Sequence, residues 1–363
     1  EVVRYGVQYD QESTDVLYQQ SYSLLVEALS SASQPSEIDE EVWQQALTAA
    51  PGLYFDWQGE IPVEVLLGWL SVDNSVLTGT VRRMILTAAE SQVLLYYWDE
   101  STGRGYRCAS DVISTSRVAE TVGALQENGA LFAFESEDYA LLSFDTMVLP
   151  QPPQPAIYSG LNPLTGESSR WELQEQLGFP ESSVSYNAAG EQVIRNRNDT
   201  LHIAEDGRVT YEAAAEGSDR YFLAGAGIYE AVEGCRQLAQ RTLGQFCGEA
   251  SLYLMSVQET GEGGWRVEFG FALDGIQVRL GEEGWAALFL VEQGQITQFQ
   301  MQFRSYTDSG TTSVVLPERQ AAAAMGAKGH EGEELLLVYL DSGNEELVSA
   351  SWTAARTMDA EGE

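Results

Sequence analysis

The chain has 363 residues, of which 44% are hydrophobic and 10% aromatic. These fractions exclude a disordered chain, and the length exceeds what one ordinary core needs, so two or three domains are expected. Its 55 acidic and 19 basic residues give a formal charge of −36. Such a charge disfavours nucleic acid and anionic lipid as partners, and it either keeps the protein soluble or attracts a basic partner.

Residues 1–150 are expected to form an N-terminal α+β domain. Apolar residues recur at helical spacing in two segments, one with Tyr18, Tyr22, Leu25 and Leu29 and one with Ile38, Val42 and Ala46. A third helix is expected from Ile61-Pro62 to Leu70, and a fourth over 117–128 before Gly129. The expected strands are 53–57, 84–87, 92–98, 105–108, 131–134 and 140–144.

Four prolines within residues 150–155 favour an extended linker, because proline cannot join a central strand. A binding site for a proline-recognition module is the alternative. Residues 156–222 then form a small central α+β domain, with a helix over 171–177. In its hairpin, Asp206-Gly207 is expected to turn the chain between a strand with Leu201 and Ile203 and a strand with Val209 and Tyr211.

Residues 223–356 are expected to form a C-terminal α+β domain, followed by a flexible tail over 357–363. An amphipathic helix carries Ile228, Val232, Cys235, Ala239, Leu243 and Phe246 on one face. An antiparallel meander follows, then a helix from Pro317 to Met325. The strand 335–340 is expected to pair with 347–352. We expect the helices to pack on one face of the sheet, leaving the other face exposed for partners.

Residue types that usually carry catalysis are scarce. His202 should face solvent, because it alternates with Leu201 and Ile203, and His330 lies in a charged loop between glycines. The odd number of cysteines argues against a disulfide framework, and all three (Cys108, Cys235 and Cys247) are expected to be small buried residues. No His/Cys cluster has metal-ligand spacing. Asp73-Asn74 and residues 341–345 match only fragments of a calcium loop, so turns are expected there.

Other short motifs also favour structural roles. Gly225-Ala226-Gly227 could begin a dinucleotide-binding loop, but Glu230 stands where the third glycine should be and would repel a pyrophosphate. The glycosylation pattern Asn198-Asp199-Thr200 is too common to carry weight. The aromatic residues Trp285, Trp352 and Tyr339 are expected to pack in cores. No catalytic, metal-binding or cofactor-binding residue and no cofactor is therefore predicted. Which residues bind a partner is not determined by the sequence.

Several segments resemble the YycH/YycI family of Gram-positive accessory proteins: 5–9, 200–203, 208–211, 294–296, 316–317, 335–339 and Trp352. The resemblance implies a multi-domain α+β fold with antiparallel sheets, helices on one face, and a C-terminal domain similar to YycI and to PepSY domains. The strong acidity and the single lysine, Lys328, depart from the family's usual composition.

The resemblance also implies a function without catalysis. It points to an extracytoplasmic, membrane-anchored protein that regulates a cell-wall-controlling sensor histidine kinase of the WalK (YycG) type. The expected partners are that kinase and a YycI-like protein. The chain starts at Glu1 without a methionine and contains no long apolar run, so we expect its N-terminal anchor to lie outside this sequence. A secreted hydrolase using two carboxylates and a PepSY-like protease inhibitor or chaperone remain alternatives.

Overall fold

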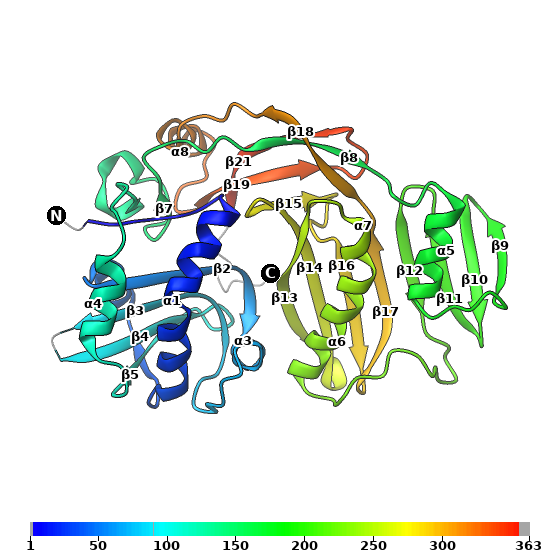
Figure 1. Ribbon diagram of the computed structural model, residues 1–363, viewed down its shortest axis with the longest axis horizontal. Coiled ribbons are helices and arrows are strands. Elements are labelled where there is room, and N and C mark those ends of the chain that lie inside the picture. The colour runs from blue at the N-terminus through cyan, green and yellow to red at the C-terminus, as the bar shows by residue number, and fades with distance from the viewer. Residues whose placement is uncertain (1–2, 90, 356–363) are drawn as a thin grey trace. The chain divides into compact units, whose positions relative to one another are not determined.

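The computed structural model describes residues 3–89 and 91–355 (Figure 1). The chain divides into two compact units. Unit 1 comprises the chain up to Gln154, then Val314–Leu337 and the chain from Ser351 onward. Unit 2 comprises Pro155–Ser313 and Val338–Ala350. The first boundary falls inside the proline-rich segment.

Unit 1 is built on a five-stranded antiparallel sheet in the order β1-β5-β4-β3-β2. Its strands are β1 (Ser36–Ile38), β2 (Gly52–Pro62), β3 (Thr80–Ala89), β4 (Gln92–Asp99) and β5 (Arg104–Ser110). Its helices are α1 (Gln11–Ser31), α2 (Glu40–Thr48), α3 (Val63–Trp69), α4 (Thr115–Gly123) and α8 (Glu318–Ala327). A short pair, β6 (Leu131–Phe132) and β7 (Met147–Val148), and the 3₁₀ turns η1 (Ala133–Glu135) and η2 (Glu137–Tyr139) complete it.

Helix caps explain where two of these helices begin. The Asp10 carboxylate accepts a hydrogen bond from the Ser13 N–H at the start of α1, and Asp39 does the same for the Val42 N–H at the start of α2. Ile38 was expected inside the second helix, but the Asp39 cap places it in β1 instead. From α2, Trp43 and Ala46 pack with Ile85, Tyr96 and Phe132 in one core.

Helix α8 belongs to unit 1, although the sequence suggested that it packs on the C-terminal sheet. Its Ala321 and Ala322 pack with Ala133, Leu142 and Leu335. The buried face of α8 consists of small alanine side chains. The spacing of such residues predicts a helix but does not indicate against which part of the chain it packs. Its start was correct, since Pro317 occupies the N-cap position.

Unit 2 contains most of the largest sheet, in the order β19-β15-β14-β16-β17-β12-β11-β10-β9, with β13 paired to β14. The pairings are antiparallel except for β15 with β19, which is parallel. Its strands are β9 (Val184–Ala188), β10 (Glu191–Asn196), β11 (Asp199–Ala204), β12 (Arg208–Glu212), β13 (Ser251–Thr260), β14 (Gly264–Leu273), β15 (Ile276–Leu280), β16 (Ala287–Glu292) and β17 (Gln295–Gln302). Strand β19 (Glu334–Asp341) contributes residues to both units and also pairs with β21 (Ala350–Ala355).

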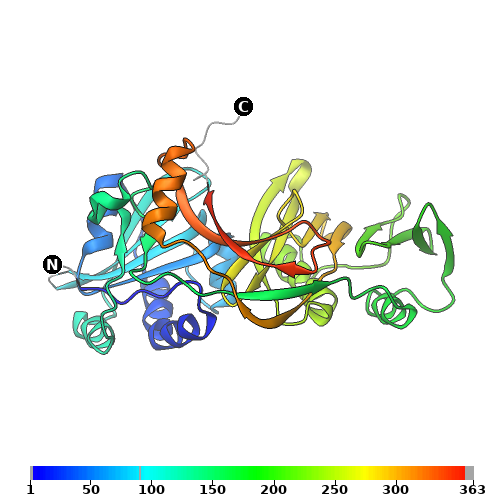
Figure 2. The same ribbon diagram turned by 90° about the horizontal axis from the view of Figure 1, so that it is seen from above.

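The helices of unit 2 lie on one face of this sheet (Figure 1; Figure 2). They are α5 (Glu167–Gln176), α6 (Ile228–Arg241) and the short α7 (Leu243–Phe246), and the 3₁₀ turn η3 (Gly261–Gly263) joins β13 to β14. Helix α6 packs against β14, β16 and β17. Under it, the rings of Phe269, Phe289 and Phe299 contact one another in series. The predicted fold class, α+β with helices on one sheet face, is thereby confirmed.

A separate three-stranded sheet is formed in the order β18-β8-β20. Its strands are β8 (Ala156–Leu161), β18 (Ser305–Thr312) and β20 (Leu347–Val348). The segment 347–352 was expected to pair as a whole with 335–340. Only its second part does so, in β21, while β20 pairs with β8.

The compact units differ from the three consecutive segments expected from the sequence. The β11–β12 hairpin forms, but residues 156–222 do not make a separate sheet, because β12 also pairs with β17 and joins the C-terminal strands. Two local expectations also fail. Residues 140–144 form turns rather than a strand. The amphipathic helix from Ile228 breaks at Thr242, whose backbone leaves helical geometry between α6 and α7.

Candidate functional site

The two histidines each pair with one carboxylate near the surface. His202 lies on β11, and its Nδ1 is 3.0 Å from Glu191 Oε2 on the neighbouring strand. His330 Nδ1 is 3.2 Å from Glu333 Oε2 in the loop before β19. Both positions agree with the sequence analysis, which placed His202 opposite to Leu201 and Ile203.

The cysteine thiols are buried and free, as expected. Burial raises the pKa of Cys108 to about 11 and that of Cys235 well above its usual value. Burial also raises the pKa of Cys247. A thiol that stays protonated at neutral pH is a poor nucleophile and a poor metal ligand.

No group of three or more His, Cys, Asp or Glu side chains that could hold a metal ion occurs within residues 3–89 and 91–355. The acidic segment at 341–345 is explained by local contacts. Asp341 ends β19, where its carboxylate accepts hydrogen bonds from Arg304 Nε at 2.9 Å and Tyr306 Oη at 2.7 Å. The Ser342 N–H then donates to the Glu345 carboxylate at 2.6 Å and closes a turn.

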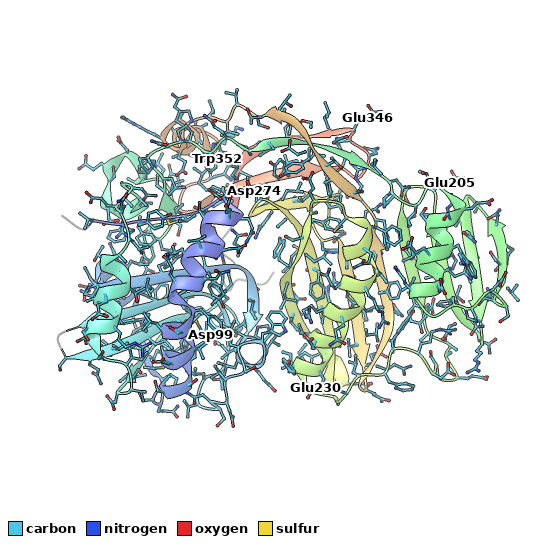
Figure 3. The ribbon with its side chains drawn as sticks, in the orientation of Figure 1. Asp99, Glu205, Glu230, Asp274, Glu346 and Trp352 are labelled. Carbon is cyan, nitrogen blue, oxygen red and sulfur yellow. The ribbon has the colours of Figure 1, made fainter. Side chains whose placement is uncertain are left out.

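The glycines before α6 form no phosphate cradle. Gly227 is the N-cap of α6, and Glu230 lies at this end of the helix (Figure 3). Its carboxylate lies next to Gly225 and Gly227, where an anion would bind. Of the aromatic residues expected in cores, Trp285 and Tyr339 are buried. Trp352 is half-buried and donates from Nε1 to the Leu316 carbonyl at 2.8 Å.

Unit 1 contains a cluster of partly buried charges around Arg82 and Arg83. Arg82 forms bidentate contacts with Asp56 on β2 and Glu334 on β19, at 2.7–2.9 Å. Arg83 pairs with Asp145 and with Glu100. Since the carboxylates are held by guanidinium groups, this cluster joins distant segments of unit 1 and exposes no free acid–base pair.

Glu318, at the start of α8, is a different kind of buried acid. It accepts a hydrogen bond from the Leu149 N–H at 3.2 Å, while its Oε1 has no hydrogen-bond partner. Burial raises the pKa of Glu318 to about 8. The side chain lies in the core beneath α8 and is only 4% exposed, which keeps it out of reach of a substrate.

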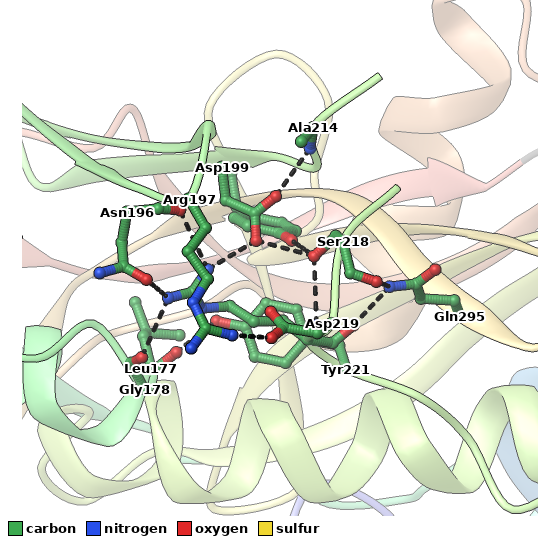
Figure 4. Close-up of polar contacts among 12 residues, drawn as sticks. Leu177, Gly178, Asn196, Arg197, Asp199, Ala214, Ser218, Asp219, Tyr221 and Gln295 are labelled. Atoms are coloured by element: carbon green, nitrogen blue, oxygen red, sulfur yellow. Dashed lines mark hydrogen bonds and ion pairs between the residues drawn. The ribbon is translucent and has the colours of Figure 1, made fainter. Parts of the chain in front are cut away.

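Unit 2 contains a buried ion pair between Asp199 on β11 and Arg220 (Figure 4). The Asp199 side chain is 1% exposed and accepts from the Ala214 N–H, Ser218 Oγ and Arg220 Nη1 at 2.6–2.7 Å. Arg220 also donates to the Asn196 side chain at 2.6 Å, and its guanidinium lies 4.1 Å from the centre of the Phe179 ring. These contacts hold the segment 213–221 against the ends of β10 and β11.

A pocket of about 310 Å³ lies beside this ion pair. It is lined by Asn198, Thr200, Glu212 and the segment 213–216. The bond from the Ala214 N–H to Asp199 positions that segment. The lining offers carboxylate, amide and hydroxyl groups, so it can accept hydrogen bonds from a basic side chain. It combines no nucleophile with a base.

The helices of the described part of unit 2 lie on one face of its sheet (Figure 1). The opposite face is called here the helix-free face. Two cross-strand rows run over it through eight strands, from β9 to β13. The first row is Val184, Arg195, Thr200, Glu212, Gln298, Leu290, Arg266 and Gln258. The second row is Tyr186, Val193, His202, Thr210, Gln300, Leu288, Glu268 and Ser256.

The helix-free face differs in charge from the chain as a whole. Its two rows contain two arginines, Arg195 and Arg266, and two glutamates, Glu212 and Glu268, whereas the chain contains 55 acidic and 19 basic residues. Amide, hydroxyl and aliphatic side chains make up most of the remainder. The charges within these two rows balance, so the rows add no local repulsion against a partner that the charge of the whole chain attracts, and this face is the candidate functional site.

No protein-family model matches the sequence, and no curated protein matches it either. The structure, however, is similar to the crystal structure of YycH from Bacillus subtilis, with a TM-score of 0.58 and 9% sequence identity. The match covers 98% of this chain and 90% of that one. The chain has a YycH-like fold. This confirms the resemblance seen in the sequence as a likeness of fold that extends through both units.

The likeness of residues 223–356 to YycI and PepSY domains remains a prediction. Of the helices in the part of the chain that the structure describes, none is long and apolar enough to cross a bilayer.

Sequence reasoning missed the Asp199–Arg220 pair and the eight-strand extent of the helix-free face. Asp199 was considered only as part of a glycosylation pattern, and the sequence gives no sign of which arginine it meets. The available signal was Asn198, a residue type that favours turns, directly before it; in the structure Arg197 and Asn198 form that turn with positive φ. Such a turn places the next residue at the start of a strand.

Proposed function

We propose that this chain is the extracytoplasmic part of a membrane-anchored accessory protein that regulates a WalK (YycG)-type sensor histidine kinase by binding to it, together with a YycI-like protein. The observation that carries the proposal is the YycH-like fold over 98% of the chain. Within the described residues of unit 2, the helices lie on one face of the sheet and leave the helix-free face without one, which suits a protein that presents a surface to partners.

The polar side chains of the described residues support a role in binding. The buried carboxylates of Asp199, Asp341 and Asp145 are each paired with an arginine. A pair of this kind is already neutralised and connects segments of the fold. Catalysis by two carboxylates would instead need an acid and a base that face a shared cleft.

The hydrolase alternative has only weak support in the raised pKa values of Glu60, Glu100 and Glu318, which burial causes. Glu318 is enclosed in the core, and Glu100 is held by Arg83 at 3.3 Å. Assays with glycosidic substrates and protease-inhibition assays are expected to give no signal above a control protein.

The proposal can be tested with the full-length protein in membranes that also contain the kinase and the YycI-like protein of the same organism. Affinity purification through a tag on this protein should recover both, and kinase autophosphorylation should change with its presence. The matched comparison is a double variant on the helix-free face, Leu288→Glu and Leu290→Glu, against Glu282→Gln and Glu283→Gln on an exposed turn. Recovery of neither partner with the unaltered protein would contradict the proposal.

A further inference from the structure

Strand β9 forms one margin of the unit 2 sheet and is exposed along its whole length. It pairs with β10 and with no other strand in the described chain. All five of its residues are exposed, and the two largest, Val184 and Tyr186, are 64% and 42% exposed. The unpaired edge of such a strand is a template on which another strand can add.

The hairpin geometry shows which backbone groups face outward. Ala189 and Gly190 both have positive φ, at 51° and 81°, and form a two-residue turn between β9 and β10. The residues that close this turn, Ala188 and Glu191, exchange backbone hydrogen bonds, and bonded pairs then alternate along the ladder. The N–H and C=O groups of Ser185 and Asn187 therefore point away from β10.

Three other margin strands of the described chain, β2, β13 and β18, carry a feature that opposes strand addition. The pairing register shifts within β2, β13 and β18, which marks a bulge or irregularity in each. Bulges, charges and prolines are the usual protections of a sheet edge. Strand β9, with the sequence Val-Ser-Tyr-Asn-Ala, has no charge, no proline, no glycine and no register shift.

The side chains of β9 define what a docked strand would meet. Val184 and Tyr186 share the helix-free face, next to Arg195, whose guanidinium is 5.9 Å from the centre of the Tyr186 ring. Apolar side chains of an added strand would pack beside these two residues. The small polar side chains of Ser185 and Asn187 lie on the other face and leave space for polar residues.

The net charge of the chain decides which kind of strand approaches. A second copy of the chain carries the same charge of −36 and is repelled, whereas a basic segment is attracted over long range. We propose that the free edge of β9 binds an extended, basic segment of another protein, which adds to the sheet as a further strand. The inference concerns this edge alone and does not depend on a kinase as the partner.

The test uses the whole chain and synthetic ten-residue peptides as probes. One peptide alternates valine with lysine, one alternates valine with glutamate, and a third is the lysine peptide with N-methyl groups on alternate backbone nitrogens. Calorimetry or fluorescence anisotropy at about 0.15 M salt gives the affinities. The matched protein variants are Asn187→Pro, which removes one outward N–H, and Asn187→Ala, which keeps it.

The lysine peptide is expected to bind the unaltered protein and Asn187→Ala equally. Binding should weaken about tenfold with Asn187→Pro or with the N-methylated peptide, because each removes backbone hydrogen bonds across the edge. The glutamate peptide should bind more weakly than the lysine peptide. Circular dichroism checks that the Asn187→Pro variant is folded. If this variant is unfolded, the N-methylated peptide still tests the backbone hydrogen bonds across the edge, because it is measured on the unaltered protein.

Three results would overturn the inference. The first is that the lysine peptide does not bind. The second is that its N-methylated form binds as tightly as the lysine peptide, or that Asn187→Pro binds the lysine peptide as tightly as the unaltered protein, because the peptide would then be held by charge alone. Sedimentation that shows a dimer of the unaltered protein, converted to a monomer by Asn187→Pro, would assign the edge to a second copy of the chain instead.

Discussion

Replacement of Asp199 by asparagine should destabilise unit 2 by about 3 kcal/mol. The carboxylate accepts three hydrogen bonds, from the Ala214 N–H, Ser218 Oγ and Arg220 Nη1. An amide keeps one acceptor oxygen but turns an NH₂ group toward donors, and it leaves the charge of Arg220 without a counterion. Breaking a buried pair typically costs about 3–5 kcal/mol. The lower end applies here because Arg220 keeps its bonds to Asn196 and is 11% exposed.

A double-mutant cycle separates the pair from its surroundings. Arg220→Met preserves apolar contact with the Phe179 ring but removes the guanidinium, and alone it leaves the Asp199 carboxylate buried without its cation. The double variant Asp199→Asn with Arg220→Met removes both charges. It should therefore lose roughly 2 kcal/mol less stability than the sum of the single variants.

The neighbouring pair of Arg197 and Asp219 provides the matched control, because it also joins the β10–β11 turn to the segment 213–221 (Figure 4), but its side chains are 73% and 56% exposed. Asp219→Asn should change stability by less than about 1 kcal/mol, and added salt should reduce that effect further. Urea unfolding followed by circular dichroism, with tryptophan fluorescence as a second probe, measures these differences. Additive single variants, or equal effects of Asp199→Asn and Asp219→Asn, would refute the reasoning.

Three other outcomes are expected. Burial raises the pKa of Glu318 from 4.5 to about 8, so the unfolded chain ionises first as pH rises, and stability should fall by roughly 1.4 kcal/mol per pH unit between those values. Glu318→Gln should remove that pH dependence from urea midpoints measured at pH 5–8, and an unchanged slope would contradict it. Gly207→Ala should cost about 1–3 kcal/mol and lower the melting temperature more than Gly281→Ala. Both glycines have positive φ, but a Cβ at Gly207 would lie 2.8 Å from the Phe303 carbonyl, whereas space at Gly281 is open. The three buried cysteines should react with a thiol reagent at pH 8 only after denaturant is added, and rapid labelling of the native protein would show that a thiol is accessible.

Local patterns were sufficient for many individual elements. The alternation of Val267, Phe269 and Phe271 with polar residues predicted β14, and Asp206-Gly207 predicted the turn between β11 and β12. These predictions succeed because a strand with one buried face must alternate, and a tight hairpin needs residues that accept its backbone angles.

Partners distant in the sequence could not be predicted in this way. Arg82 meets Glu334 across 252 residues, and β15 pairs in parallel with β19, although neither contact leaves a local pattern. The same holds for α8, whose alanine face packs in unit 1.

The sequence by itself therefore determined the class of fold, most helices and strands, and the acidic character of the surface. Only the tertiary structure decided how the strands are ordered, which carboxylates are neutralised by arginines, and which sheet face and edge remain free. The physical reason is that the period and polarity of a segment report its own backbone geometry and burial. The surface it packs against depends on the shape and charge of segments elsewhere in the chain.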